Sequence, residues 1–493
     1  MRVFRQLLSI LLCLSFTDIS GATQLTQLSL RQLELIQPSL MLDYPAEIQQ
    51  YVNFGGLTFY KNYEDLTTGQ HVATDLDADF SIGSATATFT CDRSTSSPGT
   101  YIDDNGVIQL CSATDNTARV RGGYYDATGF HAQKGLMVEG SGTNYLKQSI
   151  FATDTNSDGI SDNWSKFENC AGATIETRVS DNTFNLSNHK VTRMQYAGNP
   201  ADNNSSYILY SDNTDVGSFA QGDMVVVSVW IKGSTTAGNV VIGFREFDSS
   251  AVAGTTHYSS SILSSISSEW KKFTYTLACE DADCDRVDFR IGISGDIDAN
   301  ETVDLYVSCP QLEKMPYATS FIPTTTAALT RGAETLKYAL AGNRTVASES
   351  IFVKFSPMGH ALKNGVHYLS STDIKDRKIL AGGAGGWTNC QPNATDSSGC
   401  STFTGDDFLS NISYVTTVTC SHNSPYVLSY TDGLANGLGD TSDDFTNNAW
   451  GTYFYIGSSS VSVSQIDGII QSCAFYSDAK GAADVSQITA LLQ

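Results

Sequence analysis

Apolar and polar residues alternate along many short stretches of this chain, which is the pattern of half-buried β-strands. The alternation is clear at residues 303–308, Val-Asp-Leu-Tyr-Val-Ser, where the apolar side chains are expected to face one way and the others the opposite way. Pro310, Pro316 and Pro323 follow, and they exclude a helix and favour an extended connector. We therefore expect residues 303–331 to close one β-domain and to lead into the next.

Strand patterns recur on both sides of this stretch, with turn signals between them. No long helical pattern interrupts residues 151–330, so this region predicts a two-sheet jelly roll. Residues 333–493 predict another β-unit that ends in a short helix over 482–492, and residues 25–35 fit either a short helix or an extended arm. The clearest strands are expected at 87–90, 100–102, 106–110, 135–139, 143–146, 224–232, 240–247, 272–277, 286–292, 350–355, 426–430, 452–457 and 466–476.

Several of these strands carry distinctive motifs. The N-terminal ones are Ala87-Thr88-Phe89 with Arg93, Thr100-Tyr101-Ile102-Asp103 with Gly106-Val107-Ile108, and Gly135-Leu136-Met137-Val138-Glu139-Gly140 with Thr143-Asn144-Tyr145-Leu146. As a set they resemble the head-spike or tail-fibre module of tailed-phage virion proteins. The resemblance covers roughly residues 75–335 and implies a role in assembly or attachment.

Two later regions carry resemblances of their own. The stretch Gln311-Leu312-Glu313, Ala318–Pro323 and Thr330-Arg331 is similar to the end of a carbohydrate-binding-module-like jelly roll. The ending Ile456-Gly457, Asp467-Gly468 and Phe475-Tyr476 resembles laminin-G or concanavalin-like sandwiches. We predict an all-β chain of tandem β-sandwich (jelly roll) domains, with a signal peptide at 1–22, a short fibre- or spike-like module at 23–150, a jelly roll at 151–332 and a sandwich at 333–493.

Composition agrees with this organisation. The chain has 493 residues, too many for one core, and only 16% of them are charged. Its net charge of −23 argues against binding nucleic acid or an anionic membrane surface.

The first 22 residues predict export. Arg2 and Arg5 precede a short apolar run at 7–16, and Ser20-Gly21-Ala22 offers small residues for cleavage. A lipoprotein acceptor at Cys13 is the weaker alternative, because bulky leucines precede it. We expect a secreted or cell-surface protein that does not span the membrane, with virion membership as the alternative.

Cysteine usage fits an oxidising compartment. Eleven cysteines less Cys13 leave ten, an even number. Metal binding is the rival interpretation, but the chain has no Cys-x-x-Cys. We expect five disulfides, pairing Cys91 with Cys111, Cys170 with Cys309, Cys279 with Cys284, Cys390 with Cys400, and Cys420 with Cys473.

A metal site is expected in the loop at 154–162. Oxygen-bearing side chains alternate there, and Gly159 permits a sharp turn. The Glu that closes an EF-hand loop is missing, since Ser165 stands in its place, and a plain Asx-rich turn is the alternative. The sequence predicts a structural calcium ion held by Asp154, Asn156, Asp158, Ile160 and Asp162.

Sugar recognition requires flat apolar rings beside polar groups. Trp230 lies inside an apolar run and is expected in the core. We expect ligand contacts from other aromatic residues, namely Tyr207, Tyr210, Trp270 and Trp387.

Catalysis finds little support. Sandwich glycosidases need paired carboxylates on alternating strand positions, but the sequence contains no Glu-x-Asp-x-Glu. None of its seven histidines belongs to a recognisable Ser or Cys nucleophile motif. The sequence therefore predicts a non-catalytic protein that recognises a surface polysaccharide or glycoconjugate. The alternatives are a structural tail-fibre or head-spike component, which a homotrimer would accompany, and a diverged polysaccharide-degrading enzyme.

Overall fold

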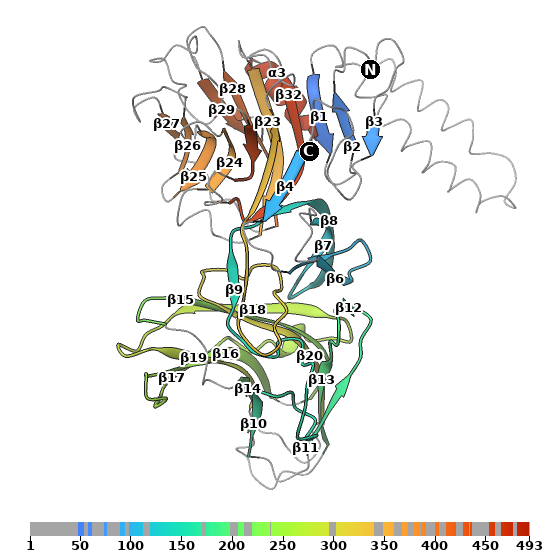
Figure 1. The fold of residues 1–493 in the computed structure, drawn as a ribbon, viewed down its shortest axis with the longest axis vertical. Helices are drawn as coiled ribbons and strands as arrows, with labels where there is room; N and C mark the ends of the chain where they lie inside the picture. The colour runs from blue at the N-terminus through green and yellow to red at the C-terminus, as the bar shows by residue number, and fades with distance from the viewer. Residues whose placement is uncertain are drawn as a thin grey trace, which may run out of the picture.

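The computed structural model describes residues 98–111, 119–169, 174–197, 206–211, 219–236, 238–294 and 302–339, with shorter stretches between 48 and 93 and between 349 and 492. Nearly all regular elements in these residues are strands (Figure 1). The exceptions are the 3₁₀ turn η3 (Leu263–Ser265) and the helix α3 (Ala482–Leu492). The predicted all-β class and the C-terminal helix are confirmed. Within this part of the chain, no helix has the length and apolar character needed to cross a membrane.

The middle of the chain folds into two five-stranded antiparallel sheets. One sheet has the order β10 (Trp164–Asn169), β14 (Ser206–Ser211), β19 (Arg286–Ser294), β16 (Asn239–Phe247) and β17 (Ala253–Tyr258). The other has the order β11 (Thr174–Val179), β13 (Val191–Ala197), β20 (Thr302–Glu313), β15 (Met224–Thr235) and β18 (Lys271–Ala278).

Alternate residues of these strands meet in one core. Phe289 and Ile291 of β19 and Val227 and Val229 of β15 are fully buried in the same cluster. Trp164 packs edge-on against Phe289, with ring centroids 5.8 Å apart. The two sheets therefore bury one face each against the other, as the period-2 patterns predict.

Strand β20 confirms the alternation predicted for 303–308 and continues beyond it. Leu305 and Val307 are fully buried, and the strand runs through Pro310 to Glu313. The pairing register between β15 and β20 shifts between Ser228 and Trp230, and Cys309 adopts a φ of 50°. A proline is tolerated in a strand at such a bulge, so Pro310 marks an irregularity inside the strand rather than its end.

Strands from both ends of the chain share two further large sheets (Figure 1). One sheet has the order β3 (Ala73–Asp75), β2 (Thr58–Lys61), β1 (Ile48–Asn53), β32 (Gly468–Tyr476), β23 (Glu349–Pro357), β28 (Tyr414–Cys420), β29 (Val427–Thr431) and β30 (Leu434–Ala435), and β7 (Val120–Asp126) and β8 (Gly129–Val138) join it at β32. A second has the order β27 (Cys400–Phe403), β26 (Gly386–Cys390), β25 (Lys378–Gly383), β24 (His367–Thr372), β31 (Tyr453–Ile456), β22 (Glu334–Ala339) and β4 (Phe89–Arg93).

Two small sheets connect these units to the jelly roll. They are β12 (Phe184–Asn185), β6 (Ile108–Cys111) and β5 (Gly99–Ile102), and β21 (Leu329–Arg331) with β9 (Gly142–Asn144). The strands expected within 23–150 thus do not form one sheet of their own. Strands β1, β4 and β8 pair with C-terminal strands, whereas β6 pairs with β12 of the middle region.

A buried ionic cluster joins these regions. The Arg119 guanidinium donates to both carboxylate oxygens of Glu334, at 2.7 and 2.6 Å, and to Glu139, at 2.5 Å. Arg331 lies 3.4 Å from the same Glu139 carboxylate, and all four side chains are fully buried. Glu139 belongs to the motifs that carried the virion resemblance, and Arg331 belongs to the motif that resembles the end of a jelly roll. These motifs therefore form internal contacts between distant segments.

Acid is expected to destabilise the fold in two steps. Burial lowers the pKa of His189 to about 4, whereas the charges of Arg331 and Arg119 outweigh burial and lower the pKa of Glu139 to about 2. Both groups bind protons more weakly in the folded chain, so stability falls as the pH drops from about 6.5 to 4 for His189 and from about 4.5 to 2 for Glu139. Each unit of difference in pKa is worth about 1.4 kcal/mol.

Thermal melts of the wild type and of His189→Gln between pH 7 and pH 3 test this expectation. The variant should lose the decline between pH 6.5 and 4 and keep the decline below it. An unchanged decline in the variant would assign the first step to another group.

Candidate functional site

The structure separates the four aromatic residues expected to contact a ligand. Tyr207 is 4% exposed and lies in the jelly-roll core. Trp270 is 5% exposed, its indole N–H faces Asp181 at 3.3 Å, and the Lys232 ammonium covers its ring at 4.7 Å. Neither ring presents a free face, because core packing has already covered it. Trp387 belongs to β26, and its side chain lies outside the described residues.

Tyr210 is the one of these four that the structure places on an accessible surface of the described residues. It is half-buried on the outer face of the sheet β10-β14-β19-β16-β17, where it pairs with Arg290 of β19. A hollow of about 560 Å³ lies over this face. Its lining residues are Ser165, Phe167, Ile208, Tyr210, Ser211, Arg245, Phe247, Asp288 and Arg290.

Strand alternation explains how these side chains come together. In β19 the odd-numbered Phe289 and Ile291 point into the core, so Asp288 and Arg290 point outward. In β16 the residue opposite Arg290 is Gly243. A side chain at Gly243 would collide with the backbone carbonyl of His257 and the ring of Tyr258, so glycine permits the close approach of β17 at this point.

The hollow combines apolar rings with fixed cations. Phe167 is 52% exposed, and the Arg290 guanidinium lies 5.5 Å from the centre of the Tyr210 ring. Arg245 lies similarly over Phe247, at 5.6 Å. Aromatic rings of this kind offer flat contact area at a low entropic cost, and each guanidinium carries several hydrogen-bond donors in a fixed plane.

Asp288 holds Arg290 in position. The two side chains make a bidentate pair, with N–O distances of 2.8 and 2.7 Å, and the backbone N–H of Arg245 donates to the same carboxylate at 3.1 Å. Asp288 is 1% exposed, and burial raises the pKa of its carboxyl more than Arg290 lowers it. The Asp288 carboxyl therefore needs the neighbouring Arg290 charge to stay ionised, and the ion pair holds the Arg290 guanidinium in one orientation.

The predicted calcium loop uses its side chains as turn-forming groups. Asp162 accepts hydrogen bonds from the backbone and hydroxyl of Thr155, at 2.8 and 3.0 Å, and Asp158 accepts from the backbone N–H of Ile160 at 2.8 Å. Asn156 donates to Asp158 at 2.9 Å, and Asp154 accepts from the backbone N–H of Gly159 at 3.1 Å. The contact between Asp158 and Ile160 has the spacing of an Asx-turn, and the others are hydrogen bonds across the loop.

Calcium at this loop stays a prediction. In the described part of the chain, the carboxylates of Asp154, Asp158 and Asp162 do not come together as three ligand atoms within 4.8 Å of one another. One oxygen of Asp154 is buried without a hydrogen bond, and Arg178 lies 3.7 Å from the other. A calcium titration of the thermal midpoint, with and without chelator, tests whether an ion binds there.

The structure describes the side chains of four cysteines of the predicted disulfide framework, namely Cys111, Cys279, Cys284 and Cys309. Cys279 and Cys284 are thiols whose sulfur atoms lie within 4.8 Å of each other, and a disulfide between them stays a prediction. Cys309 is a buried thiol whose sulfur lies 3.6 Å from His189, and Cys170 lies outside the described residues. Cys111 is buried at the end of β6. The side chains of Cys91, Cys390, Cys400, Cys420 and Cys473 are not described, so their pairings stay predictions.

Comparisons with known proteins leave the function open. No family model and no curated protein matches the chain. Solved structures with partial likeness include the enzymatically active domain of tailspike protein 4 from bacteriophage CBA120, at 10% identity and a TM-score of 0.27. That match covers 35% of this chain but only 21% of the tailspike chain.

Two other solved structures have similar scores. A family 11 carbohydrate-binding module from Clostridium thermocellum is 12% identical, with coverage of 38% of this chain and 98% of the module and a TM-score of 0.22. The sialidase of Trypanosoma rangeli is 9% identical, with coverage of 82% and 92% and a TM-score of 0.26. At these scores the likenesses assign no function, and the head-spike and laminin-G resemblances stay predictions.

Proposed function

We propose that this chain is a non-catalytic glycan-binding protein and that the sugar lies in the hollow on the outer face of β10, β14, β19 and β16. The observation that carries the proposal is the exposed ring of Phe167 beside Tyr210 and the fixed Arg290 guanidinium. A pyranose ring has apolar C–H faces that pack on such rings and hydroxyls that accept from guanidinium groups.

The chemistry of the lining favours binding over hydrolysis. Asp288 is the one carboxylate among the described residues that line the hollow, and Arg290 already engages both of its oxygens. Glycoside hydrolysis ordinarily needs two carboxyl groups across the scissile bond, one of them free to give a proton. The proposal is therefore recognition of a neutral or acidic glycan without turnover.

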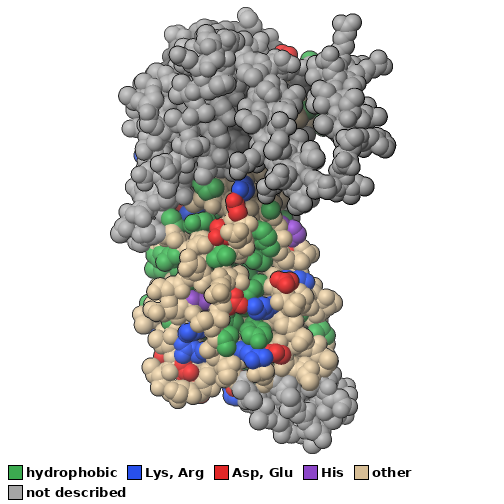
Figure 2. All heavy atoms as spheres, turned by 90° about the vertical axis from the view of Figure 1, so that its right-hand side faces the viewer, with side chains coloured by type: hydrophobic (Ala, Val, Ile, Leu, Met, Phe, Trp, Pro, Cys, Tyr) green, Lys and Arg blue, Asp and Glu red, His purple; other side chains and the backbone are tan. Residues whose placement is uncertain are grey.

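Mixed surface charge is compatible with such a ligand. On the face drawn in Figure 2, basic, acidic and hydrophobic side chains of the described residues are interspersed, and no patch of one charge extends across it. Recognition of a glycan relies on a few directed contacts and does not need a large field of one sign.

Tyr210→Ala is expected to weaken glycan binding by about tenfold or more, because losing an anchoring aromatic ring typically costs at least about 1.4 kcal/mol. A glycan array with the full chain identifies the ligand, and calorimetry then compares the variants. Tyr210→Phe, which keeps the ring, should bind almost as well as the wild type.

Phe130→Ala is the matched control, since Phe130 is another exposed phenylalanine, 37% exposed, on β8 and outside the hollow. It should leave binding unchanged, whereas Phe167→Ala should weaken it. Saturable binding that neither Tyr210→Ala nor Phe167→Ala affects would refute this site. Absence of binding to any glycan on the array would refute the function.

A further inference from the structure

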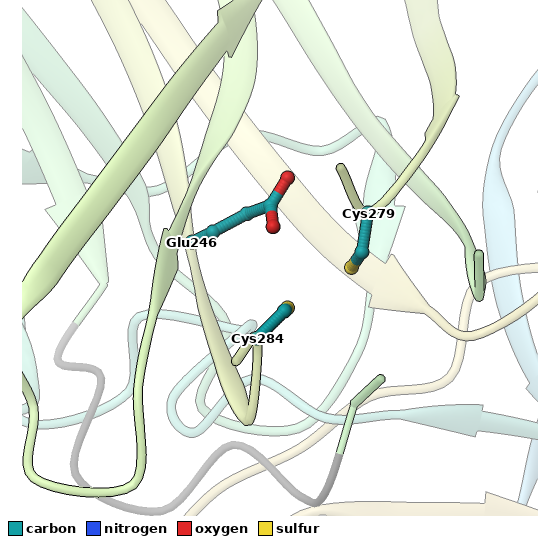
Figure 3. Close-up of side chains that lie close together, drawn as sticks. All are labelled: Glu246, Cys279 and Cys284. Atoms are coloured by element: carbon teal, nitrogen blue, oxygen red, sulfur yellow. The ribbon is translucent and has the colours of Figure 1, made fainter. Parts of the chain in front are cut away.

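Three metal-ligating side chains converge at one end of the jelly roll (Figure 3). Glu246 comes from β16, Cys279 follows β18, and Cys284 precedes β19. Their ligand atoms all lie within 4.8 Å of one another, and the residues are only 0%, 2% and 6% exposed. Figure 3 shows the Glu246 carboxylate and both sulfur atoms pointing toward the space between them.

Hydrogen bonds hold the carboxylate of this cluster in place. The backbone N–H groups of Glu280 and Asp281 each donate to one oxygen of Glu246, both at 2.9 Å. The Nε2 atom of the buried His257 lies 2.5 Å from the Oε1 atom. Outer contacts of this kind fix the orientation of a metal ligand before the metal arrives.

Hydrogen bonds also hold the two cysteines. The backbone N–H of Cys279 donates to the carbonyl of Asp223 at 2.9 Å, and the N–H of Cys284 donates to the carbonyl of Asp281 at 3.2 Å. The tight turn therefore presents both sulfur atoms on the side of Glu246. The four residues between the cysteines match a spacing common in structural zinc sites.

We propose that Glu246, Cys279 and Cys284 bind a thiophilic divalent cation of the Zn²⁺ class. Two thiolates and one carboxylate suit Zn²⁺, whereas Ca²⁺ and Mg²⁺ prefer oxygen ligands throughout. Water or another small ligand would complete the shell. On binding, each S–H bond breaks, each sulfur forms a bond to the metal, and two protons pass to solvent.

A divalent cation would compensate the charge of the two thiolates and connect the β18–β19 turn to β16.

The competing outcome is the disulfide that the sequence predicts for the same two cysteines. It would need an oxidant, and it would leave Glu246 with a purely structural role toward the turn. A disulfide leaves no free thiol at Cys279 or Cys284 and does not require the Glu246 carboxylate. The metal site requires both thiols and the carboxylate, so one set of measurements on the full chain separates the two outcomes.

The test is a Co²⁺ titration of the reduced, metal-free full chain, followed by displacement with Zn²⁺. One equivalent should produce a thiolate-to-cobalt charge-transfer band that Zn²⁺ abolishes. Zn²⁺ should also slow alkylation of Cys279 and Cys284, measured by peptide mass spectrometry, and raise the thermal midpoint. The alkylation measurement needs no variant and so does not depend on a substituted chain folding.

Variants define the ligands. Cys279→Ser and Cys284→Ser should each abolish tight binding, and Glu246→Gln should weaken it by about tenfold or more while the band remains. Cys309→Ala, which removes a buried thiol of β20 outside the cluster, should leave the titration unchanged. The proposal would be overturned by a band that survives in Cys279→Ser, by unprotected thiols in the presence of Zn²⁺, or by a Cys279–Cys284 disulfide whose reduction yields no metal binding.

Discussion

Arg119→Ala is expected to lower the free energy of unfolding by about 3–5 kcal/mol, since it removes one partner from a fully buried ionic cluster. The Arg119 guanidinium bridges Glu139 and Glu334 and also donates to the carbonyl of Thr100 at 2.7 Å. Without it, two buried carboxylates would lose the guanidinium that both of them contact, although Arg331 lies 3.4 Å from Glu139. Denaturant unfolding followed by circular dichroism and by tryptophan fluorescence measures the loss.

Arg193→Ala is the matched control. Arg193 pairs with Asp304 in an equally well-formed bidentate contact, with both distances 2.8 Å, but that pair lies at the surface. Its removal should change stability far less, because water already solvates both partners. Equal effects of the two substitutions would mean that burial does not decide the strength of the Arg119 cluster.

The sequence predicted the five long strands β15, β16, β18, β19 and β20 of the jelly roll because each is strongly patterned. The shorter strands β10, β11, β13, β14 and β17 were not predicted. In β15 and β19, one face of the strand is almost entirely apolar, and this local signal survives in the fold. The pairing of β1 with β32 was not predictable in the same way. The two strands are separated by most of the chain, and no local pattern specifies a partner at that distance.

The candidate site shows the same division. The sequence predicts Tyr210 as a ligand residue because it follows a polar stretch, and the structure places it at the hollow. The same argument also selects Tyr207 of the same strand, but its side chain faces the core. A strict period-2 assignment for 206–211 would have separated the two. Asp288 and Arg290 had a signal too, since they alternate with buried residues in β19.

The sequence indicated the two cysteines of the cysteine–carboxylate cluster but not its glutamate. The close spacing of Cys279 and Cys284 pointed to a local pair, and the sequence interpretation as a disulfide followed from the even number of cysteines. Glu246 lies on another strand, more than thirty residues away, and only the pairing of β16 with β19 brings it beside the turn. Chemistry that depends on non-local strand pairing is the part that a single sequence does not reveal.

Arg290→Ala is expected to abolish glycan binding and to lower the free energy of unfolding by about 3–5 kcal/mol. The stability is lost because the Asp288 carboxylate, 2% exposed as a side chain, would stay buried without its bidentate partner. The binding is lost because Arg290 supplies the guanidinium beside Tyr210. Calorimetry on the glycan that the array identifies and denaturant unfolding measure the two effects separately.

The double variant Asp288→Asn with Arg290→Gln separates the two roles of this arginine. Removing both charges takes away the uncompensated carboxylate, so most of the stability should return. Binding should not return, because glutamine cannot offer the planar set of donors that a guanidinium provides. If binding recovered together with stability, Arg290 would act only by supporting the sheet, and the ligand would depend on Phe167 and Tyr210 alone.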